Sequence, residues 1–326
     1  MTIHPGFTGF WQSAAAMTRT AARGARALLG LLATLLLLLL PVAWQGAAAH
    51  ALPPAPPAVV PVPGLVSAQL LGEAKTVRLA SGAIVAIDIA QILQRGELVV
   101  AMLGVDTPPF FQMKGEQLSG IDVTLAEQMA AELKVPLRVN RSGRSFNEVV
   151  EIVARGDADL AISKLSRTLT RAQSVLFSDP YLSLNHALIL NRLAFARISR
   201  DKPLPWVLRN FTGTLGVIDQ SSFADFAVRN FPNAKIIAYP SWDAVIAAVK
   251  SGEVVGAYRD EFEVRRILKA DPSLALTLRT VTLKDLNDTL GIAVGVRSPT
   301  LLAFVNQFLA QRNEKLTVEK VLAELK

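Results

Sequence analysis

Hydroxyl and guanidinium side chains follow a short apolar run in the middle of this chain. Residues 156–171 read Gly-Asp-Ala-Asp-Leu-Ala-Ile-Ser-Lys-Leu-Ser-Arg-Thr-Leu-Thr-Arg, so the run 160–162 enters a polar turn that ends at Arg171. A short apolar run beside turn residues is typical of a buried strand. A planar guanidinium can bind a carboxylate through two parallel hydrogen bonds. The segment therefore predicts a carboxylate site, although serine and threonine are also common in ordinary turns and Arg171 could be solvated or cap a helix.

The rest of the composition excludes several other kinds of site. The 326 residues include no cysteine, which excludes thiolate catalysis, disulfides and cysteine-ligated metals. His186 is the only histidine beyond the N-terminal region, so we expect neither a hydrolase triad nor a histidine-rich metal site. The net charge is +7, but the charges are dispersed and the glycines do not form a phosphate loop. We expect no cofactor, no metal and no nucleic-acid partner.

A basic segment and a long apolar run open the chain. The apolar run Ala27–Trp44 follows several arginines, and residues 49–51 form a small-x-small pattern. These features predict a secretory signal peptide over residues 1–51 and a periplasmic protein. An uncleaved anchor is the alternative, because the run approaches the roughly 17–25 residues that span a bilayer. Met17 is an alternative start.

A proline-rich segment and then an alternating pattern of strands and helices follow residue 51. Residues 53–63 are rich in proline, so 52–86 is expected to be a linker with a weakly structured end. From residue 87 short β-like runs alternate with amphipathic helices, which predicts an α/β fold. The expected strands are 98–103, 137–140, 160–163, 187–190, 214–218, 235–238, 254–258 and 291–296.

Two helices have clear boundaries in the sequence. Ser241–Ser251 has apolar residues at helical spacing, begins with a capping serine and is followed by Gly252. Val123–Leu133 has the same periodicity, with Asp122 as its expected N-cap. Both predict elements that cover a sheet.

A helix, a polar turn and a strand occur in the same order in Phe146–Ile162 and in Trp242–Tyr258. This loose repeat predicts two similar lobes, each with its own sheet. Ser183–Arg192 and Asp288–Val296 are the expected connections between them. The chain would then divide into lobe one, residues 87–190 and 290–326, and lobe two, residues 191–289.

Ordered motifs in this part of the chain resemble the family 3 extracellular solute-binding proteins, the polar amino-acid receptors of ABC importers. The resemblance runs from about Ile89 to the C-terminus. It is carried by Pro108-Pro109-Phe110, Gly120-Ile121-Asp122-Val123, the polar turn, Phe177-Ser178-Asp179-Pro180-Tyr181, Leu215-Gly216-Val217-Ile218-Asp219-Gln220-Ser221-Ser222 and Val254-Val255-Gly256-Ala257-Tyr258-Arg259-Asp260. It implies the two-lobed periplasmic binding protein-like II fold, with two hinge strands and closure on a ligand. It also implies an amino-acid ligand, an ABC transporter permease as partner, and binding in place of catalysis.

The resemblance assigns opposite charges to the two lobes. Arg171 matches the arginine that pairs with the ligand α-carboxylate, and Asp260 matches the carboxylate that holds its α-ammonium. A zwitterion would supply the partner that each of these charges needs in a closed cleft. The alternative for Asp260 is to cap a helix that contains Phe262 and Ile267.

Further positions are carried over from the same motifs. Ser163, Lys164 and Ser166 match the serine-rich turn that completes the ligand contacts. Ser222 matches a group at a helix N-terminus that meets the carboxylate, with plain capping as the alternative. Phe146 matches an aromatic that stacks on the ligand side chain, and core packing explains it as well.

The chain also departs from the family pattern. Lys164 and Arg167 add positive charge to a turn that is often neutral, and the segment 104–110 lacks the usual cage for a cationic side chain. We therefore expect an anionic or polar ligand, such as an acidic amino acid, unless Lys164 points to solvent. Two other functions stay open on this scaffold, a periplasmic cyclohexadienyl dehydratase-like enzyme and a membrane-tethered amino-acid sensor.

Overall fold

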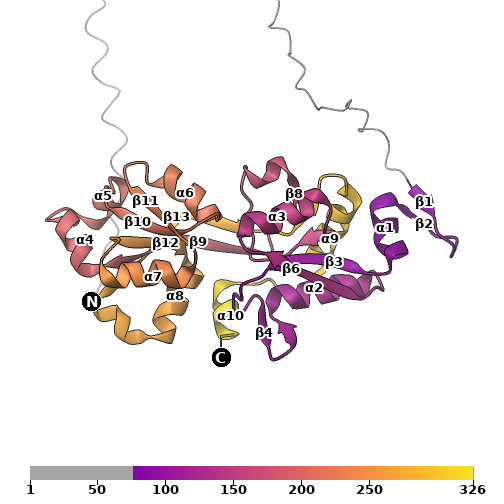
Figure 1. The fold of residues 1–326 in the computed structure, drawn as a ribbon, viewed down its shortest axis with the longest axis horizontal. Helices are drawn as coiled ribbons and strands as arrows, with labels where there is room; N and C mark the ends of the chain where they lie inside the picture. The colour runs from indigo at the N-terminus through magenta and orange to yellow at the C-terminus, as the bar shows by residue number, and fades with distance from the viewer. Residues whose placement is uncertain (1–75, 326) are drawn as a thin grey trace, which may run out of the picture. The chain divides into compact units, whose positions relative to one another are not determined.

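A computed structural model describes residues 76–325, which form two five-stranded sheets flanked by helices (Figure 1). The α/β prediction is confirmed. We call the parts built on the first and second sheet half one and half two. The expected signal peptide, its anchor alternative and the proline-rich segment lie outside the described residues. Within 76–325, every helix is too short or too polar to cross a membrane.

Half one is built on a sheet with the strand order β6-β3-β7-β14-β8. The inner strand β3 is parallel to β6 and β7, and β14 is antiparallel to β7 and β8. All six residues of β3 are apolar and buried, as expected for a strand covered on both faces. The strands are β3 (Leu98–Leu103), β6 (Leu137–Gly143), β7 (Leu160–Ala161), β8 (Val175–Phe177) and β14 (Ala293–Gly295), and the helices are α1 (Ile87–Arg95), α2 (Ile121–Glu132), α3 (Phe146–Arg155), α9 (Pro299–Gln311) and α10 (Val318–Ala323).

Half two has the strand order β11-β10-β12-β9-β13. Apolar clusters lie on both faces of its sheet. Ile189 packs with α7 on one face, and its neighbour Leu188 packs with α6 on the other. The strands are β9 (Leu182–Asn191), β10 (Thr214–Ile218), β11 (Lys235–Tyr239), β12 (Gly256–Asp260) and β13 (Leu278–Leu290), and the helices are α4 (Arg192–Ser199), α5 (Leu204–Arg209), α6 (Ser222–Asn230), α7 (Trp242–Ser251) and α8 (Glu261–Ala270).

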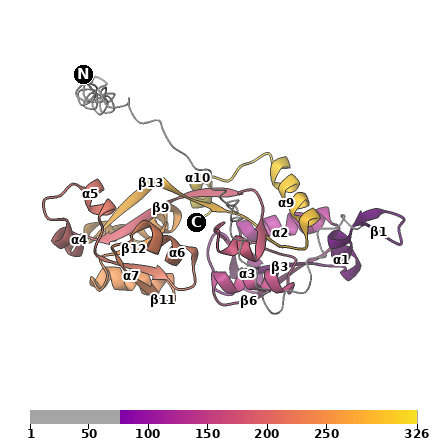
Figure 2. The ribbon, with the colours of Figure 1, turned by 90° about the horizontal axis from the view of Figure 1, so that it is seen from above.

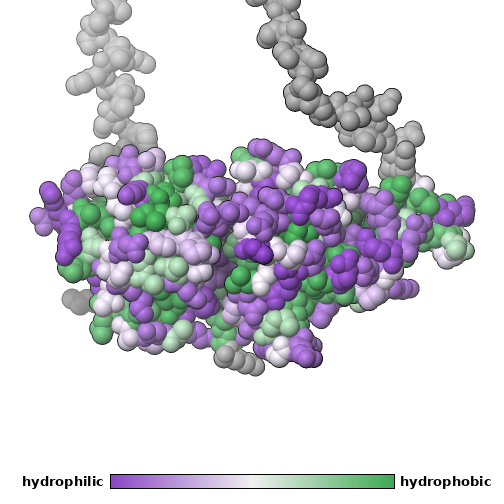
Figure 3. Space-filling view, in the orientation of Figure 1, coloured by the Kyte–Doolittle hydropathy of each residue, from purple (hydrophilic) through white to green (hydrophobic). Residues whose placement is uncertain are grey.

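Small elements complete the described part of the chain. β1 (Thr76–Arg78) and β2 (Ile84–Ala86) form one hairpin, and β4 (Gln112–Lys114) and β5 (Gln117–Ser119) form another. Two short 3₁₀ helices, η1 (Arg171–Gln173) and η2 (Pro272–Leu276), follow the polar turn and α8. On the face shown in Figure 3, hydrophilic and hydrophobic residues are interspersed over both halves.

Two long strands connect the halves. β9 and β13 pair antiparallel from Asn191 and Leu278 at one end to Leu182 and Leu290 at the other (Figure 2). Leu182 and Leu290 belong to the core of half one, whereas the other ends pack in half two. The pairing shifts register between Leu283 and Asn287. β9 matches the expected connection Ser183–Arg192, but the second connecting strand is β13 and not Asp288–Val296, because residues 293–295 form β14 in the sheet of half one. The boundaries of the lobes stay a prediction.

Most local boundaries follow the sequence, but the strand expected over 254–258 runs over Gly256–Asp260, the one expected over 160–163 ends at Ala161, and one expected cap is wrong. Ser241 caps α7 by accepting a hydrogen bond from the backbone of Ala244 (3.2 Å), and Gly252 ends it in a left-handed conformation. The prediction that Asp122 is the N-cap of α2 is wrong, since Gly120 precedes the helix and Asp122 is buried in its first turn. The Asp122 carboxylate instead accepts hydrogen bonds from the Lys164 backbone N–H (2.7 Å) and the Tyr181 hydroxyl (3.1 Å). Burial raises the pKa of Asp122 to about 7.

Candidate functional site

A small cavity between the halves brings charged side chains together. Its volume is about 10 Å³, and it lies where the loop after β7 meets the ends of α6, β12 and β13. Six of the seven residues expected at the ligand site line it, and Ser163 does not. The polar and aromatic lining comprises Phe146, Lys164, Ser166 and Arg171 from half one and Ser222, Phe223, Arg259, Asp260 and Asp288 from half two.

Ser163 holds the loop in place instead. Its side chain is buried, and its hydroxyl accepts a hydrogen bond from the backbone N–H of Leu103 (2.9 Å) at the end of β3. This bond joins the start of the polar turn to the neighbouring strand. Ser163 therefore positions the residues that follow it.

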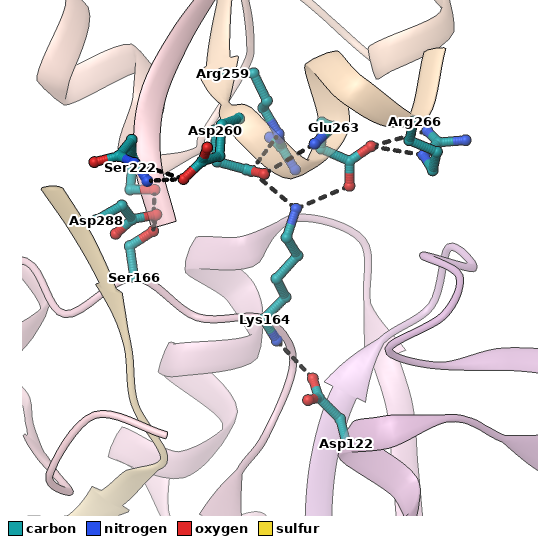
Figure 4. A network of polar contacts seen from close by, with 11 residues as sticks. Asp122, Lys164, Ser166, Ser222, Arg259, Asp260, Glu263, Arg266 and Asp288 are labelled. Atoms are coloured by element: carbon teal, nitrogen blue, oxygen red, sulfur yellow. Dashed lines mark hydrogen bonds and ion pairs between the residues drawn. The ribbon is translucent and has the colours of Figure 1, made fainter. Parts of the chain in front are cut away.

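Lys164 crosses from half one into half two. Its Nζ atom donates to Asp260 Oδ2 and to Glu263 Oε1, each at 2.8 Å, and all three side chains are only 2% exposed (Figure 4). The rings of Phe110 and Phe262 lie 5.2 and 5.1 Å from the same nitrogen. Lys164 thus does not point to solvent. Two carboxylates and two aromatic faces surround its ammonium.

Glu263 was missed by the sequence analysis. It lies in the first turn of α8, three residues after Asp260, and it also contacts Arg266 at 2.9 Å. Burial alone would raise the pKa of Glu263, but the charges of Lys164 and Arg266 outweigh it and lower the pKa to about 2. The acidic run at the start of α8 was the available signal. Nothing in the run distinguishes a buried carboxylate from one that only favours the helix N-terminus.

Asp260 has the two roles that the sequence left open. It ends β12 and caps α8, because Oδ1 accepts a hydrogen bond from the Glu263 backbone N–H (3.1 Å). Its other oxygen, Oδ2, accepts from Lys164 and lies 3.6 Å from Arg259 Nε. The carboxylate lines the cavity, and both of its oxygens have partners within the protein.

Arg171 also lines the cavity, at the start of η1. Its Nε and Nη2 atoms donate to Asn147 Oδ1 (3.2 and 3.0 Å), and Nη1 donates to the Ser166 carbonyl (3.1 Å). Burial lowers the pKa of Arg171 to about 10, so it remains a cation at neutral pH. These three bonds hold the guanidinium plane in one orientation against the cavity.

A chain of hydroxyls leads from half two to a second missed carboxylate. Ser222 Oγ lies 2.7 Å from Ser166 Oγ, which donates to Asp288 Oδ2 (2.8 Å). Within residues 76–325, Asp288 Oδ1 has no hydrogen-bond partner. Burial raises the pKa of Asp288 to about 6. The sequence placed Asp288 only in a connecting strand.

Arg259 is the third missed residue, one position before Asp260 on β12. Its side chain is buried, and its guanidinium carbon lies 5.4 Å from the Phe146 ring, 5.7 Å from that of Phe223 and 5.8 Å from that of Trp242. In the described part of the chain Arg259 Nε has no hydrogen-bond partner. Aromatic rings from both halves therefore enclose this side chain.

A larger cavity of about 440 Å³ adjoins the small one. Phe146 and Arg259 line both, and residues from the two halves line the rest, including Thr107, Ile218, Gln220 and Trp242. Ser145 Oγ donates to Gln220 Oε1 (3.0 Å) from half one to half two. This volume is within the range of small-molecule sites in proteins.

Known proteins with similar sequences fall into two groups. The chain is 28% identical over 197 residues to membrane-bound lytic murein transglycosylase F of Idiomarina loihiensis, covering 58% of this chain but only 40% of that protein. It is 22% identical over 218 residues to an arginine-binding periplasmic protein of Mannheimia haemolytica, covering 66% of this chain and 85% of that protein.

Solved structures agree in fold at low sequence identity. An ancestral amino acid-binding protein, described as a precursor of cyclohexadienyl dehydratase, has a TM-score of 0.58 at 24% identity and covers 72% of this chain and 97% of its own. An amino acid ABC transporter substrate-binding protein of Streptococcus pneumoniae, bound to L-arginine, has a TM-score of 0.57 at 24% identity, with 72% and 96% covered. The two-lobed fold is therefore confirmed.

The family model for bacterial extracellular solute-binding proteins, family 3, matches residues 98–324. This range contains both sheets, the polar turn and every residue of the small cavity. The expected resemblance is confirmed. The chain belongs to family 3 of the bacterial extracellular solute-binding proteins.

Proposed function

We propose that this protein captures a small carboxylate, an amino acid or a similar acid, outside the cytoplasm and delivers it to an ABC importer. The observation that carries the proposal is the set of buried charges that both halves place around the inter-half cavity. Buried charges are tolerated when they are paired, and a ligand carboxylate would pair with the guanidinium groups there. We propose binding without catalysis because most members of this family are binding proteins.

Hinge closure is supported by the connections between the halves. β9 and β13 are two paired strands, and the cavity residues lie on elements at either side of them. Movement about these strands would separate Arg171 and Ser166 from Ser222, Arg259 and Asp260. A ligand that contacts both groups would favour the closed arrangement, because it binds that arrangement more tightly.

Arg171 is the proposed carboxylate-binding residue, and calorimetric titration tests this role. The wild-type protein is titrated with glutamate, aspartate, glutamine, arginine, histidine and small carboxylic acids. For each ligand that binds, we expect Arg171→Ala to weaken binding by roughly 30-fold or more, as when one partner of a buried charge pair is removed. Arg167→Ala is the matched control, because Arg167 is an exposed arginine of the same turn. It should leave affinity within about twofold, since exposed pairs contribute little.

Each result of the titration has a clear meaning. Equal affinities in Arg171→Ala and the wild type would contradict the proposed site. Failure of the wild type to bind any compound of the panel would contradict the function itself. Tightest binding of arginine or lysine would contradict the expectation of an anionic or polar ligand.

A dehydratase is the second candidate, and Asp288 is the observation that favours it. Its pKa of about 6 and its unpartnered oxygen in the cavity suit a group that exchanges a proton near neutral pH. The structurally similar dehydratase precursor belongs to the same scaffold. Loss of prephenate absorbance with the wild type but not with Asp288→Asn would support this candidate.

A membrane-tethered sensor is the third candidate. N-terminal sequencing of the exported protein would test it.

A further inference from the structure

Carboxylates and aromatic rings form a cage around the Lys164 ammonium. Two carboxylates accept its hydrogen bonds at 2.8 Å, two phenyl rings face it at about 5 Å, and the side chain is 2% exposed. Carboxylates and aromatic faces are the groups that bind an ammonium ion in proteins. The cation that fills this cage belongs to the protein, so the cage is closed to an ammonium group of a ligand while Lys164 remains there.

Two charged side chains of the small cavity have unused hydrogen-bonding capacity, although one of them, Arg259, has its Nε 3.6 Å from Asp260 Oδ2. Arg259 Nε is a buried donor and Asp288 Oδ1 a buried acceptor, and within residues 76–325 neither has a hydrogen-bond partner. Both residues line the cavity, together with Arg171. An unpaired buried polar group is costly, so these atoms favour a ligand that accepts from Arg259 and donates to Asp288.

The balance of charge decides what kind of donor fits. Lys164, Arg171 and Arg259 in the lining and Arg266 beside it are four cations, against the three carboxylates of Asp260, Asp288 and Glu263. A ligand with one carboxylate and an uncharged donor neutralises the excess. A zwitterionic amino acid would leave the excess in place and would put a second ammonium near that of Lys164.

We propose that the ligand is a small α-hydroxycarboxylate, and that Lys164 supplies from within the protein the ammonium that an amino acid would bring. The ligand carboxylate binds between Arg171 and Arg259, and its hydroxyl donates to Asp288 Oδ1. The halves must part slightly about β9 and β13 to admit these groups, because the small cavity of about 10 Å³ has room for about one water molecule. The remainder of the ligand extends into the adjoining cavity of about 440 Å³, which shares Phe146 and Arg259 with the small one. This inference rests on the proposed function, since it names the class of carboxylate bound at the same site.

Matched pairs of ligands test this inference on the wild-type protein. Each pair differs only in a hydroxyl or an ammonium at the α-carbon: L-lactate and L-alanine, L-malate and L-aspartate, L-2-hydroxyglutarate and L-glutamate, and the α-hydroxy analogue of arginine and L-arginine. Calorimetric titration at pH 7.5 is expected to show at least one pair in which the hydroxy acid binds about tenfold or more tightly than the amino acid, because like charges in a closed site repel.

The outcomes separate the two proposals. If the amino acid binds at least as tightly as its hydroxy analogue in every pair that binds, the inference is overturned. The proposed capture of a small carboxylate is not contradicted by that result. If the larger panel contains ligands but no α-hydroxy acid binds, the inference is again overturned. If nothing binds at all, capture of small carboxylates is itself contradicted, and the inference falls with it.

A variant then tests the role of Lys164 directly. Lys164→Ser removes the internal ammonium and leaves Asp260 and Glu263 able to receive an ammonium from the ligand. We expect the preference within the best pair to reverse toward the amino acid. Arg167→Ala removes an exposed cation from the same turn and should keep the wild-type preference. A folded Lys164→Ser that keeps the wild-type preference would overturn the role of Lys164; if it does not fold, the ligand pairs decide alone.

Discussion

Two groups of buried charges meet at the small cavity, the Lys164 side and the Asp288 side, and they differ in how completely hydrogen bonds satisfy them. On the Lys164 side, Lys164 bonds to Asp260 and Glu263, and Glu263 bonds in turn to Arg266. On the Asp288 side, Asp288 Oδ1 has no hydrogen-bond partner among residues 76–325, and neither has Arg259 Nε, which lies 3.6 Å from Asp260 Oδ2. Both sides are buried to a similar extent. The difference is therefore one of hydrogen bonding and not of exposure.

This difference distinguishes a contact that holds the halves together from a site that awaits a partner. A buried ion pair with full hydrogen bonding fixes a geometry, whereas a buried charged group with an unmade hydrogen bond costs free energy until something completes it. The Lys164 side should therefore support the fold, and the Asp288 side should weaken it. Removing the charge of Lys164 should therefore lower the free energy of unfolding, whereas removing that of Asp288 should raise it.

Lys164→Met is expected to give the largest effect. It leaves Asp260 and Glu263 buried without their shared cation, which should lower the free energy of unfolding by about 3–5 kcal/mol. Urea denaturation followed by circular dichroism measures the change. The triple variant Lys164→Met, Asp260→Asn, Glu263→Gln removes all three charges and should recover most of the loss. A loss below about 1 kcal/mol in the single variant would show that the cluster does not hold the halves together.

Most of the fold was predictable because it rests on local patterns. The buried strand Leu98–Leu103 and the capped helix Trp242–Ser251 were both expected at these positions, since apolar runs and capping residues act within a few positions. Asp122 was misplaced as a cap because an aspartate before an apolar helix usually is one. Its burial depends on Lys164 and Tyr181, which are distant in the sequence.

Site residues that lie within the family motifs could be predicted. Contacts between residues of different motifs could not. Arg171, Ser166, Ser222 and Asp260 were expected together, and they line one cavity. The partner of Lys164 could not be inferred, because Glu263 lies 99 residues away and approaches only when the halves meet. Asp288 was hidden for the same reason, since its partner Ser166 lies on another element.

Asp288→Asn should give an effect of the opposite sign. Burial raises the folded-state pKa of Asp288 to about 6, so the ionised carboxylate is disfavoured in the fold and stability is lost as pH rises through 6. The amide carries no charge, so the variant should be more stable than the wild type at pH 8, by about 2 kcal/mol. The gain should shrink below pH 6 and disappear below about pH 3, where the aspartate is protonated in both the folded and unfolded states.

Asp285→Asn is the matched control for this pH dependence. Asp285 is an exposed aspartate on the same strand, β13, so its neutralisation should change stability by less than about 0.5 kcal/mol at either pH. Urea denaturation at pH 8 and pH 4.5 compares the two variants. Destabilisation by Asp288→Asn at pH 8 would show that the carboxylate supports the fold, and the contrast between the two sides would be lost.

Arg266→Ala is expected to give the smallest effect, although Arg266 contacts the same carboxylate as Lys164. Its Nη2 atom lies 2.9 Å from Glu263 Oε2, but its side chain is 26% exposed, so water can replace much of the contact. We expect a loss of about 1 kcal/mol, smaller in 1 M NaCl because salt screens exposed pairs. Arg265→Ala, which removes a more exposed arginine of α8, is the control and should cost less. If Arg266→Ala were as destabilising as Lys164→Met, Glu263 would depend on both cations equally, and burial of the Lys164 contact would not explain its strength.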